Sequence, residues 1–349
     1  MSFNWPDLLT GLVNRHDLDV DAASWAMKEI LEGNATPVQI AGLMVALRAK
    51  GETVGEVAGL ASAMLAHARP IELPREAVDI VGTGGDRANT VNVSTMAALV
   101  IAAAGGRVVK HGNRAASSAC GTADVLEALG VVLDLPPEQQ RRVFDEVGIV
   151  FLFASFYHPS LRHAAIPRRE LGISTTFNFL GPLANPARPV AQAVGVADAR
   201  MAALMADVLA GRGNRGLVFH GGDGLDELTT TTTSDVWVVA GGRSVPTRLD
   251  PADLGLARAV REDLVGGGPE RNAAVVRDVL GGARGAVRDI VALNAAAGLL
   301  AYDGPDPDRP LSEQLAVTLA RAERALDDGS TARLLGRWVE LTRTLAASG

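Results

Sequence analysis

Val78-Asp79-Ile80-Val81-Gly82-Thr83-Gly84-Gly85-Asp86 is the stretch of this 349-residue chain that decides its fold. The first four residues suit a buried strand, and the strand runs directly into a glycine-rich turn. Glycines expose backbone N–H groups without obstruction by Cβ atoms, which suits a bound phosphate. Asn92-Val93-Ser94-Thr95 then opens a helix over 96–104, whose N-terminal amides and hydroxyls form a second anion-binding end. Alone, either feature is an ordinary turn or cap; together they favour an anion site.

The succession of strand, glycine turn and helix recurs along the chain and predicts an α/β fold. Helical patterns separate several apolar runs, so we expect a central, mostly parallel sheet whose faces are covered. Residues 236–239 add a strand after the threonine run 229–233, which is expected to be strand or loop. The other expected strands are 78–81, 107–110, 131–133, 149–153, 190–196 and 216–219.

The first seventy residues instead predict a small helical unit. Thr36-Pro37 and the capping box that begins at Thr53 mark two helix starts, and the pattern over 21–32 indicates another helix. The chain is helical again from Arg271. We expect a small helical domain over 1–72, with 158–185 packing on it, and a larger α/β domain over 73–157 and 186–349. The glycine- and proline-rich segment 177–189 is expected to connect them.

A dense array of hydrogen-bond donors follows the strand 107–110, in the sequence KHGNRAASS over 110–118. Open α/β sheets bind ligands at the carboxyl ends of their strands, so this loop is a candidate anion site rather than a polar surface loop. Lys110 is one of only three lysines. The other two, Lys28 and Lys50, lie in helical segments and are expected at the surface. His111 is given no role in proton transfer.

Two further clusters carry charge. Asp226-Glu227, in the glycine-rich loop that begins at Gly221, offer hard oxygen ligands suited to Mg²⁺ shared with substrate phosphates. Of the arginines at 162, 168 and 169, one is expected to bind a ligand carboxylate and the others to be surface charges. The acidic residues within 327–331 follow a helical segment, so they are expected to form a helix end, a turn and the next cap.

Composition excludes several classes of protein. The net charge of −7 and the pI of about 5.4 lack the footprint of a nucleic-acid binder. Cys120 is the only cysteine, so neither an intrachain disulfide nor a thiolate zinc cluster is possible. The N-terminal sequence lacks a signal-peptide pattern, and no apolar run is long enough to span a bilayer. We expect a cytoplasmic protein that binds neither membranes nor nucleic acids.

These motifs, in this order and over nearly the whole chain, resemble those of the anthranilate phosphoribosyltransferase family. The matching stretches are GTGGD, NVST, KHGNRAASS, the stretch from HPS at 158–160 to LGPLANP at 180–186, and GLDEL at 224–228. The resemblance implies transfer of phosphoribosyl from phosphoribosyl pyrophosphate (PRPP) to the amine of anthranilate in tryptophan biosynthesis. It also implies two Mg²⁺ ions per subunit and a homodimer formed through the small helical domain. The implied fold is that of nucleoside phosphorylases and phosphoribosyltransferases, with the substrates meeting between the domains.

The resemblance also implies roles for particular residues. Lys110, Asn113 and Arg168 are the implied catalytic residues; Ser94, Asp226 and Glu227 are the implied Mg²⁺ ligands. Anthranilate would contact Gly82, Asn113 and Arg168, the last through its carboxylate. PRPP would contact Gly82, Gly85, Asp86, Thr90, Asn92, Val93, Ser94, Thr95, Lys110, His111, Gly112, Asn113, Arg114, Ala115, Ala116, Ser117, Ser118 and Thr122.

The chain departs from the family pattern at three positions. Arg87 stands where many members have glycine, while Leu161 and Ser174 replace an aromatic residue and an arginine found in some members. The acceptor pocket is therefore less well defined than the phosphate site. Two rival interpretations are a nucleoside phosphorylase on the same fold and a non-catalytic relative that binds nucleic acid. The KHGN loop and the acidic pair argue against the first, and the acidic pI argues against the second.

Overall fold

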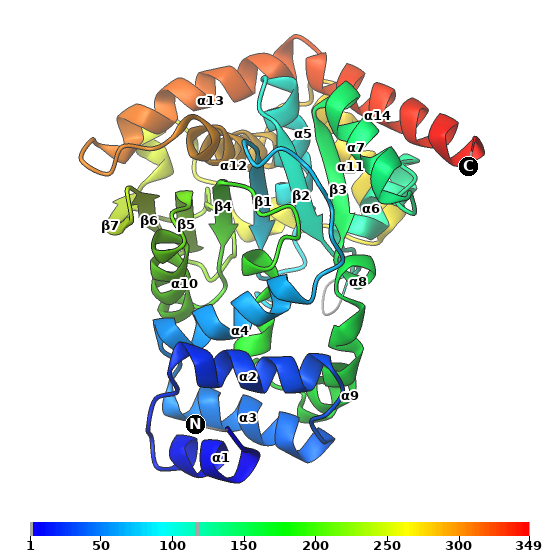
Figure 1. Ribbon diagram of the computed structural model, residues 1–349. Coiled ribbons are helices and arrows are strands. Elements are labelled where there is room, and N and C mark those ends of the chain that lie inside the picture. The colour runs from blue at the N-terminus through cyan, green and yellow to red at the C-terminus, as the bar shows by residue number, and fades with distance from the viewer. Residues whose placement is uncertain (1–2, 116–118, 349) are drawn as a thin grey trace. The chain divides into compact units, whose positions relative to one another are not determined.

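The computed structural model describes residues 3–115 and 119–348, which fall into two compact units (Figure 1). The first unit comprises residues 1–70 and 154–186, and the second comprises residues 71–153 and 187–349. None of the described helices combines the length and the apolar character that crossing a bilayer requires.

The first unit is helical. Thr36 and Thr53 each accept a hydrogen bond from the backbone N–H three residues on, and both form the reciprocal bond of a capping box. These caps begin α3 and α4, and confirm the two helix starts expected from the sequence. The helices are α1 (Trp5–Val13), α2 (Val20–Leu31), α3 (Pro37–Lys50), α4 (Val54–Ala66), α8 (Ala154–Tyr157) and α9 (Arg162–Leu171), with 3₁₀ turns η1 (Pro159–Leu161), η2 (Thr176–Asn178) and η3 (Gly181–Leu183).

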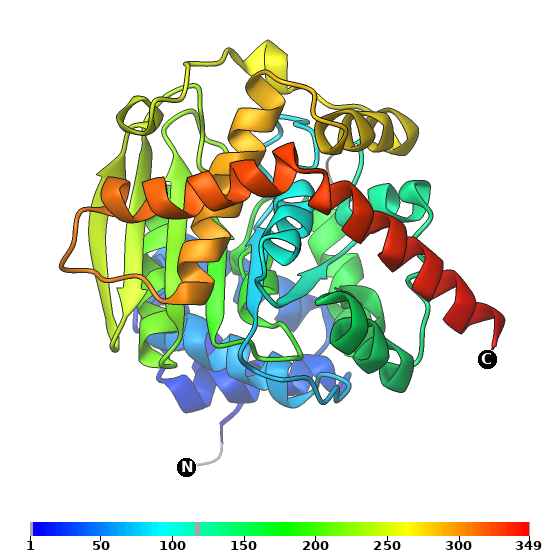
Figure 2. The same cartoon turned by 90° about the horizontal axis from the view of Figure 1, so that it is seen from above.

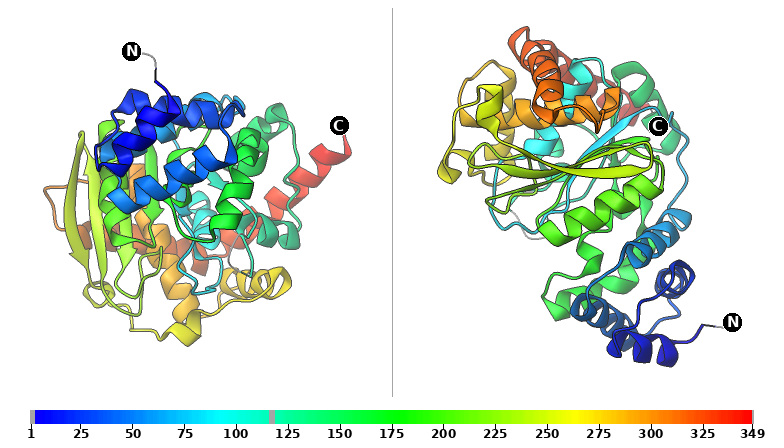
Figure 3. Two further views of the ribbon diagram at one scale, coloured as in Figure 1. Left: turned by 90° about the horizontal axis from the view of Figure 1, so that it is seen from below. Right: turned by 90° about the vertical axis from the view of Figure 1, so that its left-hand side faces the viewer.

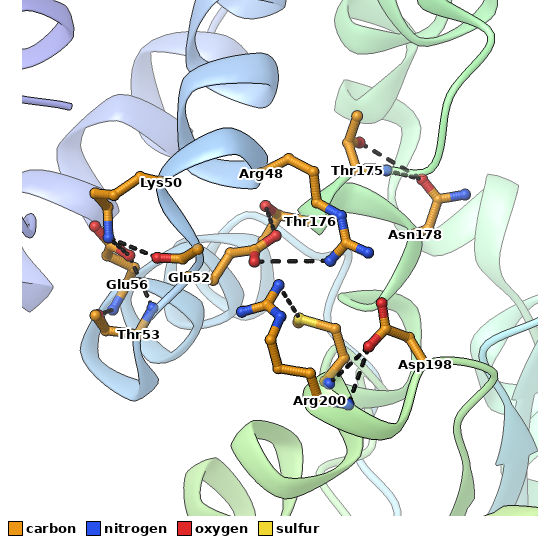
Figure 4. Close-up of polar contacts among 12 residues, drawn as sticks. Arg48, Lys50, Glu52, Thr53, Glu56, Thr175, Thr176, Asn178, Asp198 and Arg200 are labelled. Atoms are coloured by element: carbon orange, nitrogen blue, oxygen red, sulfur yellow. Dashed lines mark hydrogen bonds and ion pairs between the residues drawn. The ribbon is translucent and has the colours of Figure 1, made fainter. Parts of the chain in front are cut away.

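Lys50 lies in a buried ion pair of this unit, so its expected surface position is wrong (Figure 4). Its ammonium donates to Glu56 Oε2 at 3.0 Å and to Asp17 Oδ1 at 2.7 Å, and only 4% of the side chain is exposed. Glu56 is buried, and its carboxylate also accepts hydrogen bonds from the backbone N–H groups of Leu18 and Thr53. A buried carboxylate needs a counter-ion, and Lys50 at the end of α3 supplies it.

The second unit is built on one seven-stranded sheet in the order β3-β2-β1-β4-β5-β6-β7. The first five strands in this order are parallel, and β6 and β7 join antiparallel at one edge. The expected α/β fold with a mostly parallel sheet is thus confirmed. The strands are β1 (Val78–Gly82), β2 (Val108–Gly112), β3 (Ile149–Phe153), β4 (Ala191–Gly195), β5 (Arg215–Gly221), β6 (Ser234–Ala240) and β7 (Arg243–Leu249).

Helices cover both faces of this sheet. On one face, α12 packs on β1, β4 and β5 and against α5; α13 runs across α12 and α5, and α14 packs on α5 and α7 (Figure 2). On the other face, α10 packs under β5 and β6 (Figure 3). The helices are α5 (Val93–Ala103), α6 (Thr122–Leu129), α7 (Pro137–Val147), α10 (Ala199–Gly211), α11 (Pro269–Leu280), α12 (Ala286–Asp303), α13 (Leu311–Asp327) and α14 (Ser330–Ala347), with 3₁₀ turns η4 (Pro251–Leu254) and η5 (Arg261–Leu264).

Two strand predictions need correction. Residues 131–133 form no strand; Val131 is buried and the N–H of Val132 donates to Thr342 Oγ1 on α14, so this apolar run packs without a strand partner. The strand β7 was missed because its sequence RSVPTRL is polar and contains Pro246, as an edge strand allows. The expected helix end and turn near 327–331 are confirmed by the end of α13 at Asp327 and the start of α14 at Ser330.

Candidate functional site

The glycine loop after β1 and the acidic loop after β5 meet at the carboxyl edge of the sheet. Gly84 and Gly85 take left-handed backbone angles, with φ of 69° and 88°, which glycine adopts without strain. The N–H of Gly84 donates to Asp226 Oδ2 at 2.7 Å, across 142 residues of sequence. A Cβ on Gly82 would come within 2.2 Å of the same carboxylate oxygen, so this glycine makes room for Asp226.

The acidic pair is held in an environment that opposes ionisation. Asp226 and Glu227 are each only 9% exposed. Burial raises the pKa of Asp226 to about 7, with a further rise from Asp86 and an opposing effect from the N–H of Gly84. Burial also raises the pKa of Glu227, and so does the charge of Asp226, while Lys110 and the backbone N–H of Ser94 oppose the shift. A cation bound at this pair would remove the repulsion.

The residues present fit a magnesium ion that is shared with a ligand. Among the described residues, no group of three or more His, Cys, Asp or Glu side chains is placed to hold a metal ion. Mg²⁺ is instead commonly bound by one or two carboxylates together with substrate phosphates and water. Asp226, Glu227 and the hydroxyl of Ser94 supply hard oxygen donors of that kind.

Lys110 brings a buried cation to this edge of the sheet. Only 1% of the residue is exposed, and its ammonium donates to the carbonyl oxygen of Ile80 at 2.5 Å and to Ser94 Oγ at 3.2 Å. Burial lowers the pKa of Lys110, while the carboxylates of Asp79 and Glu227 raise it. Lys110 on β2 therefore links β1, the strand before the glycine loop, to the first turn of α5.

Asp124 on α6 binds the described residues at both ends of the loop after β2. Its carboxylate accepts from the backbone N–H groups of Ala115 at 2.9 Å and Gly121 at 2.8 Å. Arg114 donates to Glu127 Oε1 at 2.9 Å and to Asp124 Oδ1 at 3.2 Å, so carboxylates of α6 engage its guanidinium. Ala116, Ser117 and Ser118, which were expected to contact PRPP, lie outside the described residues.

Asn272 on α11 belongs to none of the motifs that the sequence offers. Its Nδ2 donates to Asn92 Oδ1 at 2.8 Å, while its own Oδ1 accepts from the N–H of Gly267 at 2.7 Å. Asn92 in turn donates to the carbonyl oxygen of Cys120 at 3.1 Å. The amide of Asn92 is thus oriented by a residue 180 positions away, with no motif around Asn272 to signal it.

The remaining expected site residues take the following places. His111 is buried and its N–H donates to Asp79 Oδ1 at 3.1 Å. Thr90 forms an isolated bridge with Val265, and the hydroxyls of Thr95 and Thr122 lie 3.4 Å apart. Val93 begins α5, Gly112 ends β2, Asp86 accepts from the N–H of Ala88, and the carbonyl oxygen of Asn113 accepts from the N–H of Ala123 at 3.2 Å.

The three candidate arginines all lie on α9, in the first unit. Arg162 and Arg169 are exposed, whereas Arg168 is half-buried. Burial lowers the pKa of the Arg168 guanidinium, since it disfavours the charged form. Burial therefore makes the charged form of Arg168 the costliest of the three. An anionic partner would stabilise the charge of Arg168 more than that of Arg162 or Arg169.

Comparison with known proteins adds an independent finding. Residues 6–68 match the helical bundle domain of a glycosyl transferase family, and residues 74–332 match the a/b domain of that family. An anthranilate phosphoribosyltransferase of Arthrobacter sp. (strain FB24) is 60% identical over 339 residues, which cover 97% of this chain and 96% of that protein.

Solved structures agree with this. The crystal structure of anthranilate phosphoribosyltransferase from Thermus thermophilus superposes with a TM-score of 0.89 at 44% identity, covering 97% of this chain and 99% of that one. The enzyme from Saccharomyces cerevisiae in complex with PRPP and Mg superposes with a TM-score of 0.86 at 26% identity, covering 97% and 98%. With its two matched domains and a 60% identical relative over almost its full length, this chain belongs to the anthranilate phosphoribosyltransferase family.

Proposed function

We propose that this chain transfers the phosphoribosyl group of PRPP to the amine of anthranilate and releases pyrophosphate, as a step of tryptophan biosynthesis. The observation that carries this proposal is the hydrogen bond from Gly84 to Asp226. It joins a glycine loop suited to phosphate with a buried acidic pair suited to Mg²⁺. A polyanion bound in an acidic protein needs both of these features at one place.

The donor side of the site is assigned to the second unit. Ser94, Asp226 and Glu227 are proposed to hold Mg²⁺, with two ions per subunit. PRPP is proposed to lie against the glycine loop, the first turn of α5, and the loop after β2. The support is the fixed placement of these segments by Lys110, by Asp124, and by the pair Asn92 and Asn272.

The reaction develops negative charge on the departing pyrophosphate and oxocarbenium character on the ribose. Bound Mg²⁺ would supply electrostatic stabilisation of the leaving group. Lys110 is buried beside Ser94, so its ammonium stabilises negative charge there in a surrounding of low dielectric constant. The N–H groups of Thr83 and Gly84 already donate to Gly195 and Asp226, so the remaining N–H groups of the glycine loop would contribute preorganised dipoles that need no reorientation during the reaction.

On the acceptor side, Gly82, Asn113 and Arg168 are proposed to contact anthranilate. The half-buried Arg168 guanidinium is suited to bind its carboxylate. The aromatic amine of anthranilate is largely unprotonated at neutral pH, so positioning does more than a general base would. The small helical domain is proposed to form a homodimer contact, and the cytoplasm is the proposed compartment.

The loss of anthranilate fluorescence on addition of PRPP, with and without Mg²⁺, tests this function directly. We expect Mg²⁺-dependent consumption of anthranilate in preference to other aromatic acids. Asp226→Asn should lower kcat/KM by roughly one to three orders of magnitude, the scale of losing one electrostatic partner. Consumption of another aromatic acid in place of anthranilate would overturn the acceptor assignment, and wild-type turnover of Asp226→Asn at limiting Mg²⁺ would overturn the metal assignment.

A further inference from the structure

Asn294 is a fully buried polar residue in the middle of α12, and none of the site contacts described above accounts for it. Its side chain points at Leu228, the residue that directly follows the acidic pair. Asn294 Oδ1 accepts from the N–H of Leu228 at 2.9 Å, and Asn294 Nδ2 donates to the carbonyl oxygen of Leu228 at 2.9 Å. Nδ2 also donates to the carbonyl oxygen of Ile290 one turn earlier, at 2.9 Å.

This arrangement fixes the backbone on the carboxyl side of Glu227. The N–H of Leu228 belongs to the peptide unit that starts at the Glu227 carbonyl, so the bond to Asn294 sets the plane of that unit. Both partners are completely buried, and hydrogen bonds in such a dry environment are costly to leave unmade. The hydrogen bonds from α12 therefore constrain the direction in which the side chain of Glu227 points.

The rest of the acidic loop is anchored on its other side. Asp226 accepts the N–H of Gly84, and Asp223 accepts the hydroxyls of Thr229 at 2.8 Å and Thr231 at 2.6 Å. These bonds hold the loop to the glycine loop and to itself. The bonds from Asn294 instead attach it to α12, which packs on β1, β4 and β5 and is buried over most of its length. Such a core helix holds its position more firmly than a loop does, because it can move away only when the whole unit unfolds.

We propose that Asn294 is a positioning residue, which orients Asp226 and Glu227 for a divalent cation through its paired hydrogen bonds to Leu228. This inference rests on the proposed function, because it takes the acidic pair as the metal site. Residues that orient metal ligands from behind typically change metal affinity by about 10–100-fold when they are replaced. The effect on the metal should therefore exceed the effect on the binding of anthranilate.

The experiment measures Mn²⁺ binding to the chain in the presence of PRPP by electron paramagnetic resonance, corrected for the Mn²⁺ that PRPP binds alone, together with the melting temperature of each variant. Asn294→Leu keeps the number and branching of the side-chain heavy atoms and removes the bonds to Leu228. Asn214→Ala is the matched control, because Asn214 Nδ2 likewise donates to backbone carbonyls, those of Pro189 at 2.9 Å and Val190 at 3.3 Å, at another place in the unit.

We expect Asn294→Leu to weaken Mn²⁺ binding at least roughly tenfold and to raise the Mg²⁺ concentration needed for half-maximal rate. The KM for anthranilate should stay close to the wild-type value. Asn214→Ala should lower the melting temperature and leave Mn²⁺ affinity unchanged. Wild-type Mn²⁺ affinity in Asn294→Leu would overturn the inference, whatever its melting temperature.

Should Asn294→Leu fail to fold, Asn294→Ser replaces it. The serine hydroxyl can return to the carbonyl of Ile290 within α12 but is too short to reach Leu228. The same weakening of Mn²⁺ binding is expected, and unchanged affinity would overturn the inference. A wild-type chain that binds no Mn²⁺ even with PRPP present would overturn the proposed metal site as well, which distinguishes the two failures.

Discussion

The backbone carbonyl oxygen of Asp226 lies so close to Gly195 that a Cβ at residue 195 would come within 1.7 Å of it. Gly195 ends β4 and pairs in register with Gly82 at the end of β1. Its carbonyl oxygen also accepts from the N–H of Thr83 at 3.0 Å. The acidic loop therefore passes over the ends of two neighbouring strands, at positions where only glycine leaves room.

Gly195→Ala should consequently displace the acidic loop. We expect the free energy of unfolding to fall by roughly 1–3 kcal/mol or more, as for other overpacked sites, and Mg²⁺-dependent activity to be nearly lost. Gly211→Ala is the control, because Gly211 ends α10 and a Cβ there meets no atom within 4 Å. Denaturant unfolding and the anthranilate assay measure both effects. A Gly195→Ala variant that is as stable and active as the wild type would contradict the close approach of the acidic loop to Gly195.

Asp226→Asn should stabilise the metal-free protein while it reduces activity. The folded-state pKa of Asp226 is raised to about 7, above the ordinary value of about 4, so the folded state binds this proton more tightly than the unfolded state. Ionisation therefore destabilises the fold, fully above about pH 7 and not at all below the ordinary pKa. Melting curves in chelator should show the variant more stable at pH 8, with the difference shrinking towards pH 4.

Asp124→Asn should do the opposite, and serves as the control for the previous prediction. Burial raises the pKa of Asp124. This rise is outweighed by the lowering effects of the N–H groups of Ala115 and Gly121 and of the Arg114 guanidinium, so the net shift of the pKa is downward. A depressed pKa contributes stability above the ordinary value of about 4 that is lost as the pH falls through the folded-state pKa. If the melting temperatures of both variants shift in the same direction at pH 8, the opposite pKa shifts given to Asp226 and Asp124 are wrong.

Arg168→Ala should mainly weaken the binding of anthranilate. The expected loss is about 1.5–3 kcal/mol, the size of a hydrogen bond to a charged group, with little change in the KM for PRPP. Arg169→Ala is matched in charge and lies one residue on, but Arg169 is exposed and its loss should be neutral. Steady-state kinetics with each substrate varied in turn measure this, and an unchanged KM for anthranilate would rule out a carboxylate clamp at Arg168.

Arg87 carries a backbone conformation that disfavours any side chain. Its φ is 58°, in the left-handed region, within the glycine loop. Arg87→Gly should relieve roughly 1 kcal/mol of strain, whereas Arg87→Ala should not, because alanine has the same Cβ. Both variants remove the same charge, so a change in the KM for PRPP that occurs in both is caused by the loss of charge. A rise in melting temperature that occurs only in Arg87→Gly is caused by the relief of backbone strain. Equal melting temperatures would exclude the strain.

Much of the fold was predictable because its signals are local. The strand and glycine turn of 78–86, the helix caps at Thr36 and Thr53, and the turn before α14 each lie within a few consecutive residues. Hydrogen bonds between such close neighbours depend on local sequence alone. The motifs also indicated which loops carry the chemistry, because strand ends in a parallel sheet share one edge.

The sequence by itself thus determined the α/β class, the helical start, and the loops around Lys110 and Asp226. Only the tertiary structure decided that Lys50 is buried, that Asn272 orients Asn92, and that Asn294 holds the residue after Glu227. These contacts join positions far apart in the chain, and burial replaces the solvent that would otherwise satisfy each polar group. Their partners are set by packing across the sheet, since no local pattern of residues specifies which distant group a buried amide or ammonium meets.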